Sequence, residues 1–228
     1  MAFWIAGAVG LVIAYLLGSI PTGYLAGQLL RGIDIREHGS ISTGATNVLR
    51  TLGKWPALAV LVIDVLKGVA AIFVARWFCP WLITKLSAVP PTASQLQAWV
   101  PWAVCLAGIA ALLGHGRSIW LNFTGGKSAA TGLGVALAMS WPVGLGAAVV
   151  FGAVLAMSRI VSLSSMLAAV TAIILVGGLE HPLPYRLLVI AGGLYVIVRH
   201  RANIQRLLAG TEPRLGQSSP DVKAEVQA

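Results

Sequence analysis

The 228-residue sequence is 57% hydrophobic and only 10% charged, whereas an average soluble domain is about 25% charged. These figures argue against a water-soluble globule, and they exclude intrinsic disorder because disordered segments are poor in apolar residues. The net charge of +9 comes from basic residues dispersed along the chain, which argues against nucleic-acid binding. Two cysteines are too few for a disulfide framework or a zinc cluster. The sequence therefore predicts an all-α integral membrane protein.

Seven apolar stretches predict seven transmembrane helices in one membrane domain, residues 1–204, with the active-site loops on its cytoplasmic side. In chain order, the predicted spans are 3–30, 55–78, 98–113, 129–139, 141–157, 163–179 and 184–198. Pro21 is expected to kink the first span. The stretch 129–139 is short for a crossing unless its helix begins before residue 129. Residues 205–228 predict a polar, mobile cytoplasmic tail.

Basic residues divide unevenly between the loops on the two sides of this predicted bundle. One side carries Arg31, Arg36, Arg50, Lys54, Arg117, Lys127, Arg159, Arg199, Arg201 and Arg206, and the other carries Arg76, Lys85 and Arg186. Because Lys and Arg concentrate in cytoplasmic loops, the N-terminus is expected outside and the C-terminus in the cytoplasm. Treating 129–157 as a re-entrant pair gives five crossings and keeps the same sidedness.

Four polar segments fall on the predicted cytoplasmic side: residues 39–50, 114–131, 158–165 and 199–206. The first two contain glycine turns, and such turns let backbone N–H groups approach an anion. The run Gly-Gly-Lys-Ser in the second segment resembles half of a nucleotide P-loop, but that motif needs a glycine where this chain has Leu121. Together, the four segments predict a site for a phosphate-bearing substrate beneath apolar helix walls that suit a fatty chain.

Structural interpretations of the same residues remain open at this point. Residues 39–50 also suit a capped helix start, Lys127 suits a lysine that snorkels to a membrane boundary, and residues 199–206 suit basic flanking of a span. Asp64 and Lys67 lie within the second predicted span at a spacing of i,i+3. We favour a structural ion pair there over a proton or ion path, since the predicted spans contain no other acidic residue.

Several catalytic motifs are absent from the sequence. The His-x4-Asp dyad of soluble acyl-CoA acyltransferases would need an aspartate at position 43, 120, 186 or 205, and these positions hold Thr43, Trp120, Arg186 and Gln205. No GxSxG nucleophile motif and no metal-ligand cluster occur either. Neither a metal nor another cofactor is therefore expected.

The sequence resembles the bacterial acyl-phosphate:glycerol-3-phosphate acyltransferases over nearly its whole length. The resemblance rests on Gly-Ser-Ile-Pro-Thr-Gly at 18–23, the 39–50 loop, Gly-His with the later Gly-Gly-Lys in 114–131, Ser-Arg-x-x-Ser-Leu at 158–163, and His-Arg-x-Asn-Ile-x-Arg-Leu at 200–207. It implies a seven-helix protein of the bacterial inner membrane that moves a fatty acyl group from acyl phosphate to the 1-hydroxyl of glycerol 3-phosphate. The products would be 1-acylglycerol 3-phosphate (lysophosphatidate) and phosphate, in the first acylation of phospholipid synthesis. Membrane lipid is an expected partner, as is a soluble enzyme that forms acyl phosphate.

The resemblance also implies roles for individual residues. The residues it implies as catalytic are His200, Ser40 and Lys127, and those implied as substrate-binding are Arg50, Thr46, Asn47, Ser162, Ser165 and Asn203. This chain departs from the family pattern at Ile41-Ser42, where Gly-Asn is common, and at Ser128, where glycine is common. A hydroxyl at Ser42 is a candidate replacement for the lost amide contact.

Acyl phosphate is a mixed anhydride that already carries its activation, so positioning and charge stabilisation are the remaining work. Three roles stay open for His200. It is a general base, it is a phosphate ligand, or a substrate phosphate takes the proton and His200 serves only as a ligand; the sequence does not separate these. Two other functions stay open: a transporter of an organic phosphate with Asp64 and Lys67 along its path, and a non-catalytic membrane partner of lipid synthesis.

Overall fold

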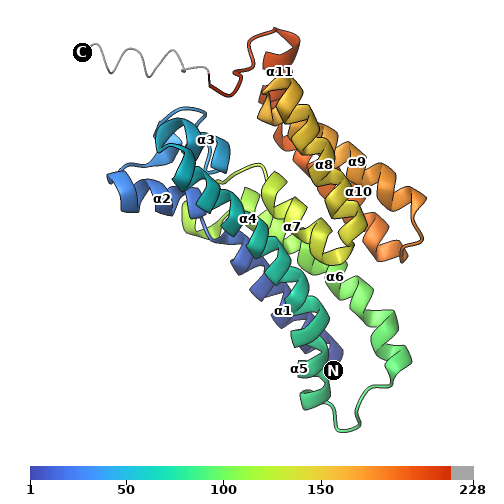
Figure 1. Ribbon diagram of the computed structural model, residues 1–228. Helices are drawn as coiled ribbons and strands as arrows, with labels where there is room; N and C mark the ends of the chain where they lie inside the picture. The colour runs from blue at the N-terminus through green and yellow to red at the C-terminus, as the bar shows by residue number, and fades with distance from the viewer. Residues whose placement is uncertain (217–228) are drawn as a thin grey trace.

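The computed structural model describes residues 1–216, and within this range the chain is helical and contains no strand (Figure 1). The long helices are α1 (Ala2–Ser19), α4 (Lys54–Phe73), α6 (Ala93–Gly116), α8 (Trp141–Ser158), α9 (Val161–Gly178) and α10 (Leu183–Arg199). The shorter elements are α2 (Thr22–Arg31), η1 (Ile35–Glu37), α3 (Ala45–Thr51), the π-helix η2 (Val74–Phe78), α5 (Cys79–Leu86), η3 (Ile119–Leu121), α7 (Ala129–Met139) and α11 (Arg201–Leu208). Helices α1, α4 and α6 form one half of the bundle and α8, α9 and α10 the other, with α7 between them.

Five helical stretches in residues 1–216 are long and apolar enough to cross a membrane: Ala2–Arg31, Lys54–Leu86, Ala93–Gly116, Trp141–Ser158 and Val161–Gly178. A sixth is present if α10 and α11, which are bent by 57° relative to each other, count as one span. The prediction of seven spans is therefore wrong. The surplus prediction is 129–139, because α7 has 11 residues and rises only about 16 Å at 1.5 Å per residue, whereas the hydrocarbon core is about 30 Å thick.

The C-terminal end of α7 is capped by Arg76, which explains how so short a helix can end inside the bundle. The guanidinium of Arg76 donates to the carbonyl oxygens of Ala138 and Met139 at 2.9 and 2.8 Å. The last carbonyls of a helix lack intrahelical partners, and a cation there also suits the helix dipole. Arg76 lies in η2, where the π-helical turn interrupts the α4–α5 stretch.

The first apolar stretch bends at Ile20–Pro21, as Pro21 predicted, and the bend is fixed by a buried charge pair on α4. Helix α1 ends at Ser19 and α2 begins at Thr22. Lys67 donates to the carbonyl oxygen of Ile20 at 3.0 Å and pairs with Asp64 at 2.8 Å. Asp64 also accepts a hydrogen bond from Thr22 at 2.6 Å. The pair therefore joins α4 to the α1–α2 junction, as the ion-pair interpretation expected.

Close approach of α4 and α7 brings the start of α7 next to Asp64. A Cβ at Gly68 would collide with the carbonyl oxygen of Thr131, and one at Gly134 would collide with that of Val65. Glycine at these two positions lets the helix backbones touch, as small residues do at membrane helix interfaces.

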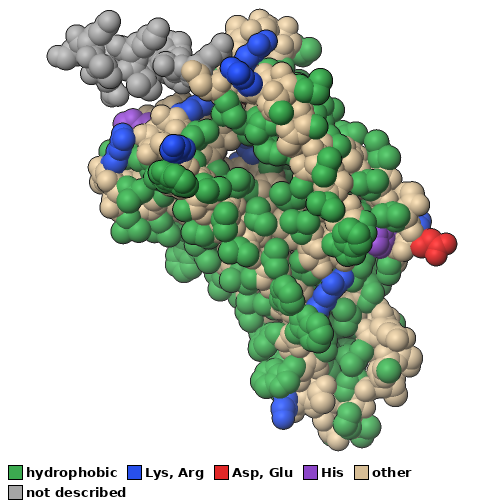
Figure 2. All heavy atoms as spheres, in the orientation of Figure 1, with side chains coloured by type: hydrophobic (Ala, Val, Ile, Leu, Met, Phe, Trp, Pro, Cys, Tyr) green, Lys and Arg blue, Asp and Glu red, His purple; other side chains and the backbone are tan. Residues whose placement is uncertain are grey.

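One end of the bundle gathers the polar segments, and the hydrophobic surface lies elsewhere. Figure 1 places α3 and α11 at this end and the N-terminus at the opposite end. In Figure 2, hydrophobic side chains cover most of the visible face, and Lys and Arg side chains lie mostly near α3 and α11. Residues 201–208 form α11, while residues 217–228 of the predicted tail lie outside the described residues. The domain division at residue 204 and the mobility of the tail stay predictions.

Candidate active site

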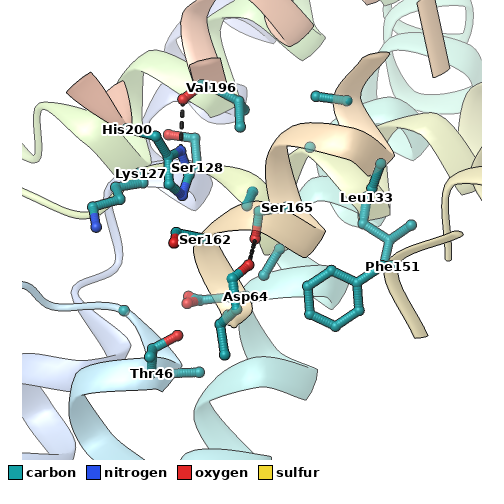
Figure 3. A pocket seen from close by; sticks show the side chains of 18 of the residues that line it. Thr46, Asp64, Lys127, Ser128, Leu133, Phe151, Ser162, Ser165, Val196 and His200 are labelled. Atoms are coloured by element: carbon teal, nitrogen blue, oxygen red, sulfur yellow. Dashed lines mark hydrogen bonds between the residues drawn. The ribbon is translucent and has the colours of Figure 1, made fainter. Parts of the chain in front are cut away.

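A cavity of about 350 Å³ opens between the polar segments at this end of the bundle. Its polar part, called the polar mouth here, comes from all four predicted segments and from Glu212. The polar mouth consists of Ser40, Thr46, Arg50, Lys127, Ser162, His200, Asn203 and Glu212. Figure 3 shows Thr46, Lys127, Ser162 and His200 on one side of the cavity, with Leu133 and Phe151 on the other. The sequence-predicted residues are thus brought together, with the exception of Asn47, which does not line the cavity.

Asn47 lies beneath the first loop and holds its shape. Its side-chain oxygen accepts the N–H of Ser40 at 2.8 Å. Its side-chain nitrogen lies 2.8, 3.0 and 2.9 Å from the carbonyl oxygens of Ile35, His38 and Ser42. Asn47 is buried, so its satisfied amide fixes where Ser40 stands at the cavity wall.

Both departures from the family pattern occur where the backbone is left-handed. Ile41 has φ 53° and Ser128 has φ 61°. This left-handed region favours glycine because glycine lacks a Cβ. The Ile41 side chain is exposed, and Ser42 Oγ accepts the N–H of Gly44 at 3.4 Å. Ser128 donates from Oγ to the carbonyl oxygen of Leu112 at 2.7 Å. The family's preference for glycine at positions 41 and 128 therefore has a conformational cause. In this chain the Ile41 side chain points to an exposed position, and the Ser128 hydroxyl gains a hydrogen bond.

The glycine turn that carries Lys127 is held from two sides. Arg199 donates to the carbonyl oxygens of Gly125 and Gly126 at 3.1 and 2.8 Å. The N–H of Gly126 donates to the carbonyl oxygen of His115 at 3.1 Å, and a Cβ at Gly126 would collide with the His115 ring. Lys127 then reaches across the cavity and donates to Asn203 Oδ1 at 2.6 Å. The turn joins the second and fourth segments.

The third and fourth segments present serine and histidine side chains to the cavity. His200 Nδ1 lies 2.7 Å from the carbonyl oxygen of Val196. A carbonyl can only accept, so Nδ1 carries the proton and Nε2 of a neutral ring is left as an acceptor. Ser165 donates to the carbonyl oxygen of Val161 at 2.9 Å, and Ser162 donates to Glu212 at 2.7 Å.

Glu212 is a residue of the site that sequence reasoning missed. Its carboxylate accepts hydrogen bonds from Ser162, Asn203 and Arg206 at 2.7, 2.6 and 2.7 Å. Burial by itself raises the pKa of Glu212, but these hydrogen bonds outweigh it and hold the pKa below its usual value. A lone acidic residue in a polar tail carries no spacing signal that would have revealed this contact.

The ammonium of Lys127 is unusually easy to deprotonate. Burial lowers the pKa of Lys127 to about 8; the Glu212 carboxylate opposes this shift, and Arg206, Arg50 and Arg199 add to it. A gathering of cations around a partly buried lysine favours a multiply charged anion as ligand, because the anion relieves their mutual repulsion.

Two further polar residues of the cavity, Asp64 and His115, also lay outside the predicted site. Both line the cavity, and His115 Nδ1 lies 3.7 Å from Asp64 Oδ1. They come from α4 and α6, 51 positions apart in the sequence, so no local motif links them.

A further part of the cavity is apolar and is called the apolar slot here. It runs between α7, α8, α9 and α10, and it is lined chiefly by Leu133, Ala136, Ala147, Ala148, Phe151, Ala168, Ala169, Ala172, Leu188, Val189, Gly192 and Gly193. One cavity therefore joins a cationic, hydrogen-bonding end to a long hydrocarbon-like end.

Comparison with known proteins agrees with this geometry. The family model for glycerol-3-phosphate acyltransferase matches residues 8–210. The chain is 78% identical to glycerol-3-phosphate acyltransferase 2 of Rhizobium johnstonii, over 95% of this chain and 99% of that one. It is 59% identical to the glycerol-3-phosphate acyltransferase of a Nostoc species, over 95% and 96% of the two chains.

Solved structures give the same result. The glycerol 3-phosphate form of PlsY, an integral membrane glycerol 3-phosphate acyltransferase, superposes with a TM-score of 0.80 at 34% identity, covering 92% of this chain and 96% of that one. Its lysophosphatidic acid form gives a TM-score of 0.77 at 33% identity, covering 92% and 95%. This chain belongs to the glycerol-3-phosphate acyltransferase family, and like PlsY it is a multi-pass integral membrane protein.

Proposed function

We propose that this protein transfers a fatty acyl group from acyl phosphate to the 1-hydroxyl of glycerol 3-phosphate, giving 1-acylglycerol 3-phosphate and phosphate in the first acylation of bacterial phospholipid synthesis. The observation that carries the proposal is the single cavity that joins the polar mouth to the apolar slot. One product of the proposed reaction has both a phosphate and a fatty chain, and each half suits one end of this cavity. Family membership supports the acceptor.

The polar mouth suits the phosphate of the acceptor. Lys127 and Arg50 supply positive charge, and Arg can bind a phosphate through two parallel hydrogen bonds. The Asn203 side-chain amide has a second N–H to donate, whereas the Ser162 hydroxyl already donates to Glu212. Helix α7 begins directly after Ser128, and the first backbone N–H groups of a helix lack intrahelical partners. Ser40 and Thr46 line the same cavity, and their hydroxyl groups suit a second phosphate, that of the donor.

The proposed reaction balances without a cofactor. The acceptor oxygen forms a bond to the acyl carbon, the bond between that carbon and the phosphate oxygen breaks, and the hydroxyl proton ends on phosphate or solvent. His200 suits the role of general base because its Nδ1 is occupied by Val196, which leaves Nε2 as an acceptor. Ser40 and Thr46, beside the donor phosphate in this arrangement, suit hydrogen bonds to it as it departs.

The proposed location is the bacterial cytoplasmic membrane, with the N-terminus outside and the polar mouth and C-terminus facing the cytoplasm. The support is the basic side chains around this end of the bundle, since such residues concentrate on the cytoplasmic side. There the polar mouth would meet soluble glycerol 3-phosphate, and a soluble enzyme that forms acyl phosphate would be a natural partner.

The test is an assay of purified protein in lipid bilayers with glycerol 3-phosphate and a long-chain acyl phosphate. We expect lysophosphatidate and phosphate in equal amounts, and no product when acyl-CoA replaces acyl phosphate. Strict dependence on acyl-CoA would remove the proposed donor. Uptake of glycerol 3-phosphate into sealed proteoliposomes without acylation would favour the transporter instead, and full activity in Lys127→Ala and Arg50→Ala would favour a non-catalytic role.

A further inference from the structure

Small residues line the apolar slot, and several of them also belong to the buried apolar core. On each helix, the lining residues farthest along the chain from the polar mouth are Ala136 on α7, Ala147 on α8, Ala172 on α9, and Leu188 and Val189 on α10. Small residues at membrane helix interfaces ordinarily let helices touch. Here they leave open volume between four helices, so the space itself is the feature that needs an explanation.

One turn farther from the polar mouth, each of the same four helices carries a buried side chain that does not line the cavity. Moving away from the polar mouth by three or four residues leads from Ala136 to Met139, from Ala147 to Val143, from Ala172 to Val176 and from Val189 to Tyr185. We call these four residues, Met139, Val143, Val176 and Tyr185, the closing layer. All four are buried in one apolar cluster, and none of them lines the cavity.

Polar contacts on the far side brace this closing layer. Arg76 donates to Tyr185 Oη at 3.0 Å and to the carbonyl oxygen of Met139 at 2.8 Å. Beyond the layer, Arg76, Met139 and Ser140 line a separate hollow at the other end of the bundle. Arg76 therefore braces two of the four members of the closing layer, Met139 through its backbone and Tyr185 through its hydroxyl, and Met139 also borders the separate hollow.

We propose that the closing layer sets the longest acyl chain that the protein accepts. The inference rests on the proposed function, because the chain concerned is that of the acyl phosphate donor. The distance along α9 from Ser162 at the polar mouth to Ala172 is about 15 Å at 1.5 Å per residue. A donor whose chain ends before the closing layer buries every methylene, and a longer one must bend or leave part of its chain outside.

The first test shortens the slot. Ala172→Leu and Ala147→Leu place a larger side chain in front of the closing layer, and kcat/KM is measured for saturated acyl phosphates of increasing chain length. We expect the preferred chain to become shorter, with a loss of about fourfold for each methylene that no longer fits, because burying one methylene contributes about 0.8 kcal/mol. Ala153→Leu is the matched control, since Ala153 lies on α8 and is exposed.

The second test lengthens the slot and covers the case in which an added side chain merely prevents folding. Val176→Ala and Val143→Ala remove volume from the closing layer, and we expect the preferred chain to become longer. Val149→Ala and Val170→Ala, at exposed positions of α8 and α9, are the matched controls and should keep the wild-type profile. The KM for glycerol 3-phosphate should not follow these shifts.

The outcomes separate this inference from the function on which it rests. An active wild-type protein whose variants all keep the wild-type length profile overturns the inference and leaves the proposed function standing. Opposite shifts in the two sets of variants support the inference. A wild-type protein that uses no acyl phosphate of any length overturns both.

Discussion

The ammonium nitrogen of Lys127 lies 2.6 Å from the side-chain oxygen of Asn203, which joins two polar segments that are 76 residues apart in the sequence. The two residues come from the glycine turn before α7 and from α11, and Arg199 ties the same two segments a second time through the carbonyl of Gly126. The polar mouth is thus formed by segments that lie far apart in the sequence, and no single segment forms it alone.

Lys127→Ala should weaken the binding of glycerol 3-phosphate more than it slows turnover. A hydrogen bond to a charged group contributes about 1.5–3 kcal/mol, so we expect KM for glycerol 3-phosphate to rise roughly 10- to 100-fold. Steady-state kinetics at saturating acyl phosphate measures this change. Lys85→Ala, an exposed position at the other end of the bundle, is the control, and an equal effect there would contradict the role of Lys127.

The affinity for glycerol 3-phosphate should decline at alkaline pH. Burial lowers the pKa of Lys127 to about 8, so its side chain is charged below that pH and neutral above it. The second phosphate pKa is about 6, so KM should be lowest between about pH 6 and 8 and should rise on both sides. In Lys127→Arg the rise in KM above pH 8 should disappear because arginine stays charged. If KM still rose above pH 8 in this variant, another group would be responsible for the titration.

His200→Ala should lower kcat rather than raise KM. A positioned general base typically contributes about 10²–10⁴-fold, and Nε2 of His200 is the acceptor that this role needs. His181→Ala, which changes a histidine at the other end of the bundle, should leave kcat within a few-fold of wild type. A rise in KM with kcat preserved in His200→Ala would instead make His200 a phosphate ligand.

Glu212→Ala should destabilise the folded protein. The Glu212 side chain is 5% exposed, and its removal leaves the donors of Ser162 and Asn203 without their partner. Because Arg206 is 41% exposed, its ion pair adds little. A loss of about 2–3 kcal/mol would lower Tm by roughly 4–12 °C, measured by thermal unfolding in detergent. Glu180→Ala, at an exposed position, is the control, and equal Tm values in the two variants would exclude a structural role.

Arg76→Ala should also lower Tm, and for a different reason. It leaves the carbonyl oxygens of Ala138 and Met139 without their donor inside the bundle, at about 1–3 kcal/mol for each unsatisfied group. Arg76→Lys should recover part of the loss, since an ammonium can donate to either carbonyl but lacks the planar fork. Arg31→Ala, at the exposed end of α2, should leave Tm unchanged, and a comparable fall there would argue against capping.

The wrong prediction of seven spans shows what a local hydropathy pattern cannot reveal. Residues 129–139 contain one polar side chain, that of Thr131, and a mostly apolar composition does not say whether a helix reaches the far side of a membrane. The sequence predicted the end at residue 139, where Ser140 and Pro142 lead into the next helix. What it did not predict is the donor for the last carbonyls of α7, because Arg76 lies more than sixty positions earlier in the chain.

The chain by itself determined the helical membrane class, the four polar segments, the break at Pro21 and the family, because hydropathy, charge placement and motif spacing are properties of neighbouring residues. Only the tertiary structure decided that α7 does not begin before Ala129 and so stays too short to span, that Asn47 supports the first loop from below, and that Asp64, His115 and Glu212 border the cavity. These facts depend on contacts between residues far apart in sequence, and such contacts are fixed by helix packing and hydrogen-bond satisfaction rather than by any local pattern.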